Sequence, residues 1–152
     1  MDPLINLAAL GIKQADFVMC NPPFFTSRED MLSTYSMKKK APSAVCTGAE
    51  VEMVTEGGDL GFVLRMVEES EKLKEIVQWY SSMLGKLSSV HEVVKRLKEK
   101  GIGNRAVTCL MAGNVTRRWV VAWSFGDLRP RNVRACFLAC CLVSEDELLI
   151  HE

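Results

Sequence analysis

The sequence predicts an α/β fold in which a strand, a helix, a second strand, a second helix and a two-stranded hairpin follow one another. Apolar runs of strand length, rich in Val, Phe, Met, Trp and Tyr, alternate with longer stretches whose apolar residues recur every three or four positions. These are the patterns of buried strands and of amphipathic helices. The last two predicted strands are joined by residues 112–116, Ala-Gly-Asn-Val-Thr, a turn-rich connection that favours a hairpin.

The first half of the chain carries the first strand and the first long helix. Residues 2–10 are apolar and end at Gly11, which favours a short helix or a packed lead-in. A buried strand is predicted over residues 16–20, and residues 26–46 show no sustained period, which indicates a long loop. Asp59 is expected to be the N-cap of a helix with apolar residues at helical spacing: Leu60, Phe62, Val63, Met66 and Val67.

The second half carries the second strand, the second helix and the hairpin. Residues 76–80 are expected to form the strand and residues 90–100 the helix, with valines and a leucine on one face and basic residues on the other, ending at Gly101. The two final strands are expected over residues 106–110 and 118–125, with Trp119 and Trp123 in the core or on a sheet face. Residues 101–103, Gly-Ile-Gly, follow a helix, so they are not a cofactor loop.

Composition limits the function classes. The chain has 152 residues, 48% of them hydrophobic and 25% charged, with a net charge of zero, which is typical of one globular domain without a global attraction to nucleic acid. No apolar run approaches the roughly 18 residues of a membrane span, and no signal peptide pattern is present. We therefore expect no membrane partner and a nuclear or cytoplasmic location.

The six cysteines do not predict a metal site. None of them forms a C-x₂-C pair, and the only cluster, Cys136 with Cys140 and Cys141, has no second half to complete a tetrahedral site. Only two histidines are present, and His91 is expected to be solvated. We therefore expect reduced thiols and no metal.

Residues 21–24, Asn-Pro-Pro-Phe, carry the chemistry, and we call them the Asn-Pro-Pro-Phe loop. Two consecutive prolines must end the preceding strand, because neither can donate a backbone N–H to a sheet. The side-chain oxygen of Asn21 and the carbonyl of Pro22 can then act as two acceptors at the carboxyl end of a sheet. An exocyclic NH₂ group offers two matching donors, and Phe24 can stack on the ring that bears it, for roughly 1–3 kcal/mol. An adenine or cytosine amine fits; the alternative is a strand-ending turn that Asn21 caps and Pro22 and Pro23 stiffen.

Several further segments extend this match to one family. The chain resembles the RNA N6-adenine methyltransferases that include the enzyme of U6 small nuclear RNA and the bacterial enzyme of 23S ribosomal RNA. The resemblance is carried by residues 16–25, 47–59, 79–86 and 118–125, of which Glu-Gly-Gly at 56–58 and Arg-Trp followed by Ala-Trp-Ser-Phe at 118–125 are the most particular. The family's Asn-Thr-Gly-Gly is replaced here by Cys-Thr-Gly-Ala at 46–49. DNA adenine and protein glutamine methyltransferases share the Asn-Pro-Pro-aromatic loop only and stay a third alternative.

The resemblance implies the second half of a Rossmann-like class I methyltransferase sheet and the use of S-adenosylmethionine. It implies that Asn21, Pro22, Pro23 and Phe24 bind the target adenine, with Asn21 also next to the cofactor, and that the substrate is RNA with an accessible adenine. RNA contacts are expected from two basic groups: Lys38, Lys39 and Lys40, and Arg117 and Arg118. Glu56 is left open between a loop-tying carboxylate and a site role. We expect loss of turnover in Asn21→Ala, because one positioned transition-state partner is worth on the order of 10²-fold or more.

The cofactor half of such a sheet is not found in this sequence. A glycine-rich turn after a first strand and an acidic residue ending a second strand are both expected there, but only fifteen residues precede Asp16. We therefore interpret residues 1–127 as a partial methyltransferase domain that lacks most of the cofactor site. Residues 128–152 form a divergent tail, with a packed helix, a disordered end and sequence foreign to the enzyme left open. The alternative function is a non-catalytic remnant that binds RNA or a protein partner.

Overall fold

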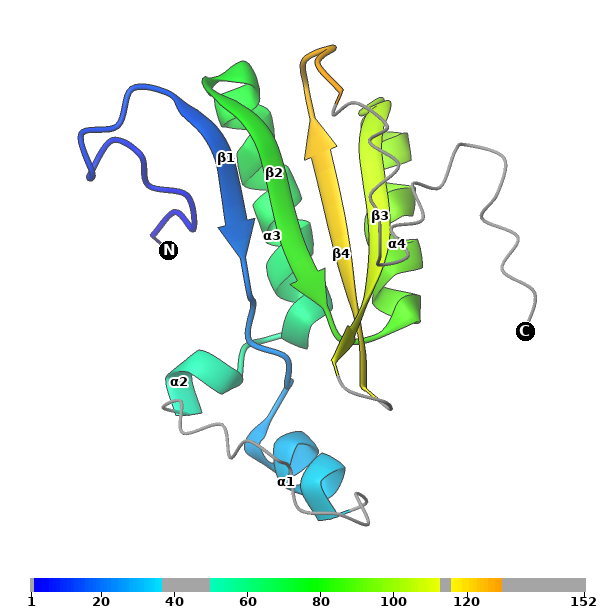
Figure 1. The fold of residues 1–152 in the computed structure, drawn as a ribbon. Helices are drawn as coiled ribbons and strands as arrows, with labels where there is room; N and C mark the ends of the chain where they lie inside the picture. Colours follow the sequence, from blue (N-terminus) through cyan, green and yellow to red (C-terminus); the bar gives the residue numbers. More distant parts are fainter. Residues whose placement is uncertain (1, 37–49, 113–115, 130–152) are drawn as a thin grey trace.

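The computed structural model describes residues 2–36, 50–112 and 116–129, which form a four-stranded sheet covered on one face by two long helices (Figure 1). The strands are β1 (Ala15–Cys20), β2 (Val77–Leu84), β3 (Asn104–Ala112) and β4 (Thr116–Ser124), in the sheet order β1-β2-β4-β3. β1 and β2 are parallel, whereas β4 is antiparallel to both β2 and β3. The predicted α/β class and its order of strand, helix, strand, helix and hairpin are confirmed.

The core lies between the sheet and the helices α3 (Gly58–Leu73) and α4 (Leu87–Glu99). Their apolar residues recur at helical spacing and are buried against β2 and β4, at roughly 1.5–3 kcal/mol for each large side chain. The valines and leucines that are completely buried on these elements are Val63, Val67, Val77, Leu84, Val90, Val93, Leu97 and Val121. The helix predicted from residue 90 starts three residues earlier. β2, β3 and β4 extend beyond the predicted runs, in part because pairing with neighbouring strands recruits polar residues such as Ser81, Asn104 and Thr116.

A stacked aromatic pair fixes α3 against the sheet. The rings of Tyr80 and Trp123 are 5.7 Å apart and nearly parallel, and both side chains are fully buried. The indole N–H of Trp123 donates to Ser70 Oγ at 3.0 Å, and the Tyr80 hydroxyl donates to the carbonyl of Lys74 at 2.7 Å. Burial raises the pKa of Tyr80 to about 12, because the charged phenolate loses its hydration there. Trp123 was expected in the core or on a sheet face, and it lies in the core.

The predicted cap of the first long helix is wrong. α3 starts at Gly58, and its N-cap is Gly57 with φ of 74°, which makes no side-chain cap hydrogen bond. A positive φ favours glycine, because other residues clash with their own backbone there. Asp59 lies in the first turn of α3 and is buried. Because its carboxylate does not cap the helix, it can accept hydrogen bonds from residues outside the helix.

The long loop predicted after the Asn-Pro-Pro-Phe loop contains a helix, α1 (Arg28–Ser36). The Asp30 N–H donates to Ser27 Oγ, and the Asp30 carboxylate accepts from the Thr26 N–H and hydroxyl, each at 3.1 Å. The two bonds from Thr26 lower the pKa of Asp30, and all three bonds cap a helix that has little apolar periodicity. A short helix, α2 (Glu50–Met53), precedes α3, and a 3₁₀ turn, η1 (Lys74–Ile76), follows it. Residues 37–49, with Lys38, Lys39 and Lys40, lie outside the described residues.

The amino-terminal segment is a packed lead-in without a helix. Leu7 is buried in the core, and the backbone N–H groups of Leu4 and Ile5 both donate to the Glu69 carboxylate on α3, at 2.6 and 3.3 Å. One of the two predicted alternatives is therefore confirmed. No helix among the described residues is long and apolar enough to cross a membrane.

The first strand is more exposed than its apolar sequence predicts. Phe17 and Met19 are 62% and 75% exposed, although the run was expected to be buried. β1 is the end strand of the sheet. Val18 and Cys20 pack against the core, so the alternation of side chains along a strand places residues 17 and 19 on the opposite face. The prediction of a strand is thus confirmed and the prediction of its burial is wrong.

Candidate functional site

The Asn-Pro-Pro-Phe loop leaves the sheet at the carboxyl end of β1, where the chain turns toward α1 and α2 (Figure 1). Asn21 is exposed, Pro22 is buried, and Pro23 and Phe24 are half-buried. The loop is thus anchored by its first proline while the amide of Asn21 faces solvent. This placement fits the predicted pair of acceptors at the carboxyl end of a parallel strand.

A distant segment ties the loop down just after Phe24. The Phe25 N–H donates to the Met53 carbonyl at 3.1 Å, and the Thr55 N–H donates to the Phe25 carbonyl at 3.0 Å, which forms a single parallel bridge between residues 25 and 54. A Cβ at Gly58 would lie 3.3 Å from the Phe24 carbonyl oxygen, and the φ of Gly58 is 60°. Residues 53–58 therefore position the backbone of the loop, with glycine required at 58.

Asp59 and Gly85 lie beside the Phe24 ring and support it. The Gly85 N–H donates to Asp59 Oδ2 at 2.7 Å, and the Ser89 hydroxyl donates to Asp59 Oδ1 at 3.1 Å. These bonds hold the turn between β2 and α4 close to the ring, since a Cβ at Gly85 would lie 3.2 Å from Phe24 Cδ1. The buried carboxylate of Asp59 therefore sets the place of Phe24 through the backbone of Gly85.

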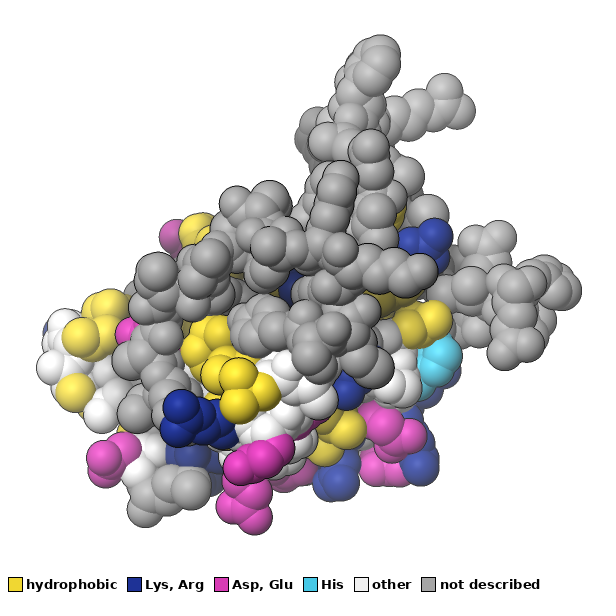
Figure 2. Space-filling model, turned by 90° about the horizontal axis from the view of Figure 1, so that it is seen from below, with side chains coloured by type: hydrophobic (Ala, Val, Ile, Leu, Met, Phe, Trp, Pro, Cys, Tyr) yellow, Lys and Arg dark blue, Asp and Glu magenta, His cyan; other side chains and the backbone are white. Residues whose placement is uncertain are grey.

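Arg118 lies over the Phe24 ring, with its guanidinium carbon 5.2 Å from the ring centroid. This is cation–π geometry, because the positive group faces the electron-rich ring. Arg118 is half-buried at the start of β4, whereas its neighbour Arg117 is exposed. Figure 2, which views this end of the molecule, shows basic side chains next to apolar ones.

Cys20 immediately precedes the loop but is not an activated nucleophile. Burial raises the pKa of its thiol, and the hydrogen bond with Ser82 lowers it by less. The neutral thiol is therefore the stable form at neutral pH. Cys20 and Cys109 are free thiols, and the described residues contain no group of His, Cys, Asp or Glu that could hold a metal ion.

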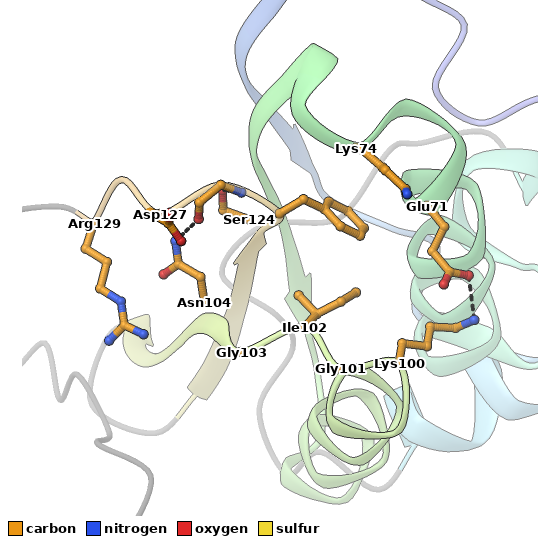
Figure 3. Close-up of a pocket in the computed structure, with 12 residues that line it drawn as sticks. Glu71, Lys74, Lys100, Gly101, Ile102, Gly103, Asn104, Ser124, Asp127 and Arg129 are labelled. Atoms are coloured by element: carbon orange, nitrogen blue, oxygen red, sulfur yellow. Dashed lines mark hydrogen bonds and ion pairs between the residues drawn. The ribbon is translucent and has the colours of Figure 1, made fainter.

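A pocket of about 480 Å³ lies at the opposite end of the sheet, between the end of α4, the start of β3 and the end of β4 (Figure 3). Its lining includes Lys74, Lys100, Phe125 and Arg129. Lys100 is already paired with Glu71 at 2.6 Å and with Glu68 at 2.7 Å. The pocket is remote from the Asn-Pro-Pro-Phe loop, because β4 begins beside Phe24 and ends here.

The structure brings together only part of the predicted site. Phe24 and Arg118 are in contact, Asn21 and Arg117 are exposed nearby, and Lys38, Lys39 and Lys40 lie outside the described residues. Asp59 and Gly85 were missed as positioning residues, although Glu-Gly-Gly-Asp at 56–59 and Leu-Gly at 84–85 belong to segments that carry the family resemblance. The Glu56 side chain is exposed, and its carbonyl oxygen would lie 2.7 Å from a Cβ at Gly61, so the backbone packs closely there; the role of the Glu56 carboxylate stays a prediction.

Fold and site together define the class of protein: an α/β domain of the methyltransferase type, with the Asn-Pro-Pro-Phe loop at the end of a parallel strand. The family model described as RNA methyltransferase matches residues 5–127. The chain belongs to this RNA methyltransferase family.

Curated relatives match most of this chain but only a small part of their own length. The U6 small nuclear RNA (adenine-(43)-N(6))-methyltransferase of Schizosaccharomyces pombe is 48% identical over 122 residues, which is 80% of this chain and 30% of the relative. The RNA N(6)-adenosine-methyltransferase mettl16 of Danio rerio is 39% identical over 117 residues, which is 76% of this chain and 25% of the relative.

Solved structures confirm the fold. The catalytic domain of human Mettl16 in complex with MAT2A 3'UTR hairpin 1 superimposes with a TM-score of 0.70 at 39% identity, covering 82% of this chain and 43% of that chain. The amino-terminal domain of human METTL16 in complex with SAH has a TM-score of 0.51 at 33% identity and covers 76% of this chain and 34% of that chain. The chain thus spans less than half of the solved domains.

Proposed function

We propose that this chain forms the target-adenine half of an S-adenosylmethionine-dependent RNA N6-adenine methyltransferase. The observation that carries the proposal is the assembly around Phe24. The Gly85 turn lies beside the Cδ1–Cε1 edge of its ring and the Arg118 guanidinium lies over one face, at the end of the strand that delivers Asn21. Three segments far apart in sequence therefore converge on one aromatic ring beside an exposed amide.

Asn21 and Pro22 orient the amine. The Asn21 side-chain oxygen and the Pro22 carbonyl accept one N–H each from the adenine amino group, which turns the nitrogen lone pair out of the plane of the base. Both acceptors also favour the positive charge that develops on the nitrogen during methyl transfer. No strong general base is needed, because the methylated nitrogen is acidic enough to lose its proton to water.

Phe24 and the basic residues hold the RNA. Phe24 stacks on the adenine, and Arg118 stays close to the ring and to the RNA backbone. Arg117, Lys38, Lys39 and Lys40 contact phosphates, which supply affinity without reading sequence. Crystal structures of the human relative with RNA hairpins support this choice of partner. An adenine in a loop or flipped out of a stem can reach the site, whereas a stacked and paired adenine cannot.

Only a small part of the proposed cofactor site lies among the described residues. Asn21 would lie beside the methyl group, and the described residues ahead of β1 form no strand that could carry a glycine-rich turn. When bound, S-adenosylmethionine supplies an electrophilic methyl group on a sulfonium. The SAH complex of the human relative supports this cofactor. Most of the cofactor site must come from residues other than those described.

A non-catalytic role of the chain alone, in binding RNA or a protein partner, is the second candidate, because the described residues ahead of β1 form no strand for a cofactor site. Calorimetric titration of the purified chain with S-adenosylhomocysteine separates the two. Micromolar binding would show that the chain builds a cofactor pocket by itself, and absence of binding would assign the chemistry to a larger assembly.

Adenine recognition is testable on the chain without the cofactor. We expect an RNA hairpin with one unpaired adenine to bind more tightly than the same hairpin with N6,N6-dimethyladenine, which lacks both N–H donors. Asn21→Ala should remove this preference and leave the salt-dependent phosphate contribution. Fluorescence anisotropy measures both, and equal affinity of the wild-type chain for the two hairpins would contradict the proposed role of the Asn-Pro-Pro-Phe loop.

A further inference from the structure

The pocket at the end of the sheet opposite the Asn-Pro-Pro-Phe loop has no part in the proposed methyl transfer (Figure 3). Its volume of about 480 Å³ falls within the range of small-molecule sites, which is roughly 300–1,000 Å³. The pocket lies where α3, α4 and β4 end and β3 begins, and these four elements supply its lining. It is therefore a separate cavity with side chains of its own.

Lys74, at one end of the pocket, occupies a backbone position that normally belongs to glycine. It follows α3 with a φ of 40°, and glycines are the only other described residues with a positive φ. Such an angle strains a residue with a side chain, and strain of this kind is found at functional sites. Lys100 at the same end is already paired with Glu68 and Glu71, whereas none of the ion pairs among the described residues involves Lys74. Lys74 is thus the cation that an anionic group can bind there.

The other end of the pocket offers hydrogen-bond acceptors next to a guanidinium. Asn104 Nδ2 donates to the carbonyls of Gly126 and Leu128, at 2.7 and 3.1 Å. Both of its hydrogens are therefore used, and Oδ1 remains as an acceptor. Asp127 adds an exposed carboxylate, and Arg129 lies at the same end (Figure 3).

An apolar wall lies between the two ends. Phe125 is half-buried and meets Tyr80 edge to face, with ring centroids 5.9 Å apart and an angle of 84° between the planes. Ile102, which lies between the two ends in Figure 3, is buried. A Cβ at Gly101 or Gly103 would meet nothing within 4 Å, so the space beside this wall is open. A planar ring can lie along the wall, as bases do on aromatic side chains.

The acceptors select among planar rings. A carboxylate such as that of Asp127 can accept two adjacent N–H donors, and guanine offers them at N1 and N2. Adenine and cytosine place one amine next to an acceptor, and uracil has a single N–H between two carbonyls. Arg129 fits the O6 and N7 acceptors of guanine, and Lys74 fits a phosphate.

We propose that this pocket binds a guanine nucleotide, with its base on Phe125 and hydrogen-bonded to Asp127, and its phosphate at Lys74. The site goes beyond the proposed function, because it lies at the end of the sheet opposite Asn21. Free guanosine monophosphate and a guanosine of a bound RNA share this chemistry.

Calorimetric titration of the purified chain with guanosine, adenosine and uridine monophosphates tests the choice of base. We expect guanosine monophosphate to bind at least about tenfold more tightly than the other two. Asp127→Asn should reverse the preference toward xanthosine monophosphate, because xanthine carries a carbonyl where guanine carries its N2 amine and an amide can donate to it. Asp16→Asn, at an exposed carboxylate outside the pocket, is the control.

Lys74→Gly tests the phosphate end. Glycine suits the φ of 40°, so thermal stability should not fall, while guanosine monophosphate should bind no more tightly than guanosine. Lys72→Ala, at an exposed lysine of α3 outside the pocket, should keep the advantage of the nucleotide over the nucleoside. Asn21→Ala should leave nucleotide binding unchanged.

Competition with a single-stranded uridine oligonucleotide that carries one guanosine identifies the source of the ligand. Displacement of guanosine monophosphate by this RNA would support the proposal with RNA as the source, and binding that the RNA does not displace would support it with the free nucleotide. Absence of guanosine monophosphate binding, equal affinity for the adenosine nucleotide, an unchanged preference in Asp127→Asn, or loss of binding in Asn21→Ala would overturn it.

Discussion

The guanidinium carbon of Arg118 lies 5.2 Å from the centroid of the Phe24 ring. The contact joins the start of β4 to the loop that follows β1, so the ring proposed to stack on the target base is oriented by a cation from the far end of the chain. A cation–π pair of this kind contributes about 0.5–1 kcal/mol at an exposed site and more when it is desolvated.

We predict that Arg118→Gln lowers methylation by a chimera, in which the matched segment of the S. pombe relative is replaced by residues 5–127 of this chain. Turnover of the chimera should fall about tenfold. In a double-mutant cycle with Phe24→Leu, the effects of the two substitutions should couple by about 0.5–1 kcal/mol, because both remove the same contact. Arg117→Gln is the control, since it removes the same charge from an exposed neighbour. If the effects of Arg118→Gln and Phe24→Leu on methylation are additive, the stacking of Arg118 on Phe24 does not contribute to turnover.

Gly85→Ala should displace Phe24 without unfolding the protein. The added Cβ would lie 3.2 Å from Phe24 Cδ1 and 3.4 Å from Asp59 Oδ2, and the ring must shift by a few tenths of an ångström. We expect about a tenfold loss of turnover by the chimera, because small displacements of positioning groups are costly in catalysis. Gly103→Ala, where a Cβ meets nothing within 4 Å, should leave turnover unchanged. Equal activities of the two variants would contradict the role of Gly85.

Asp59→Asn should destabilise the chain by about 1–3 kcal/mol, because an amide cannot accept both the Gly85 N–H and the Ser89 hydroxyl in this buried place. Urea unfolding followed by tryptophan fluorescence measures the change. Ser88→Ala, at the exposed residue next to Ser89, is the matched control. An unchanged free energy of unfolding would mean that the carboxylate does not hold the turn between β2 and α4.

The raised pKa of Tyr80 predicts a loss of stability at alkaline pH. Since its folded pKa, about 12, lies above the unfolded value near 10, Tyr80 contributes stability that is fully present below the unfolded pKa and is lost as pH rises through the folded pKa. In Tyr35→Phe, where Tyr80 is the remaining tyrosine, absorbance titration should place the phenol pKa at about 12. A midpoint near 10 would show that the hydroxyl is not buried.

The sequence predicted the order of elements well, because the apolar runs of the strands and the helical spacing of α3 and α4 both reflect burial in the core between sheet and helices. It failed where the deciding contact is local and polar, or comes from a distant segment. α1 depends on the bonds among Thr26, Ser27 and Asp30, which leave no apolar period. Asp59 has the pattern of an N-cap, but the Gly57 backbone starts the helix and the carboxylate contacts Gly85 instead.

The candidate site was predicted in part for the same reason. The Asn-Pro-Pro-Phe loop could be predicted from the sequence, because two prolines end a strand and an aromatic residue offers a stacking surface wherever they lie in a fold. The stacking of Arg118 on Phe24 depends on the register of β4 against β2, which no local pattern reports. The burial expected for Phe17 and Met19 requires a layer that the described residues do not supply. The boundary at residue 127 and the basic group at 38–40 stay predictions.

The central claim is that residues 21–24 bind the adenine that is methylated, and the chimera tests it most directly. We predict that the chimera methylates U6 RNA at N6 of adenine, that Asn21→Ala lowers its turnover by at least about 10²-fold, and that Asn6→Ala, the same truncation in the amino-terminal turn, has no effect. An Asn21→Ala chimera that methylates RNA as fast as its parent would contradict the account.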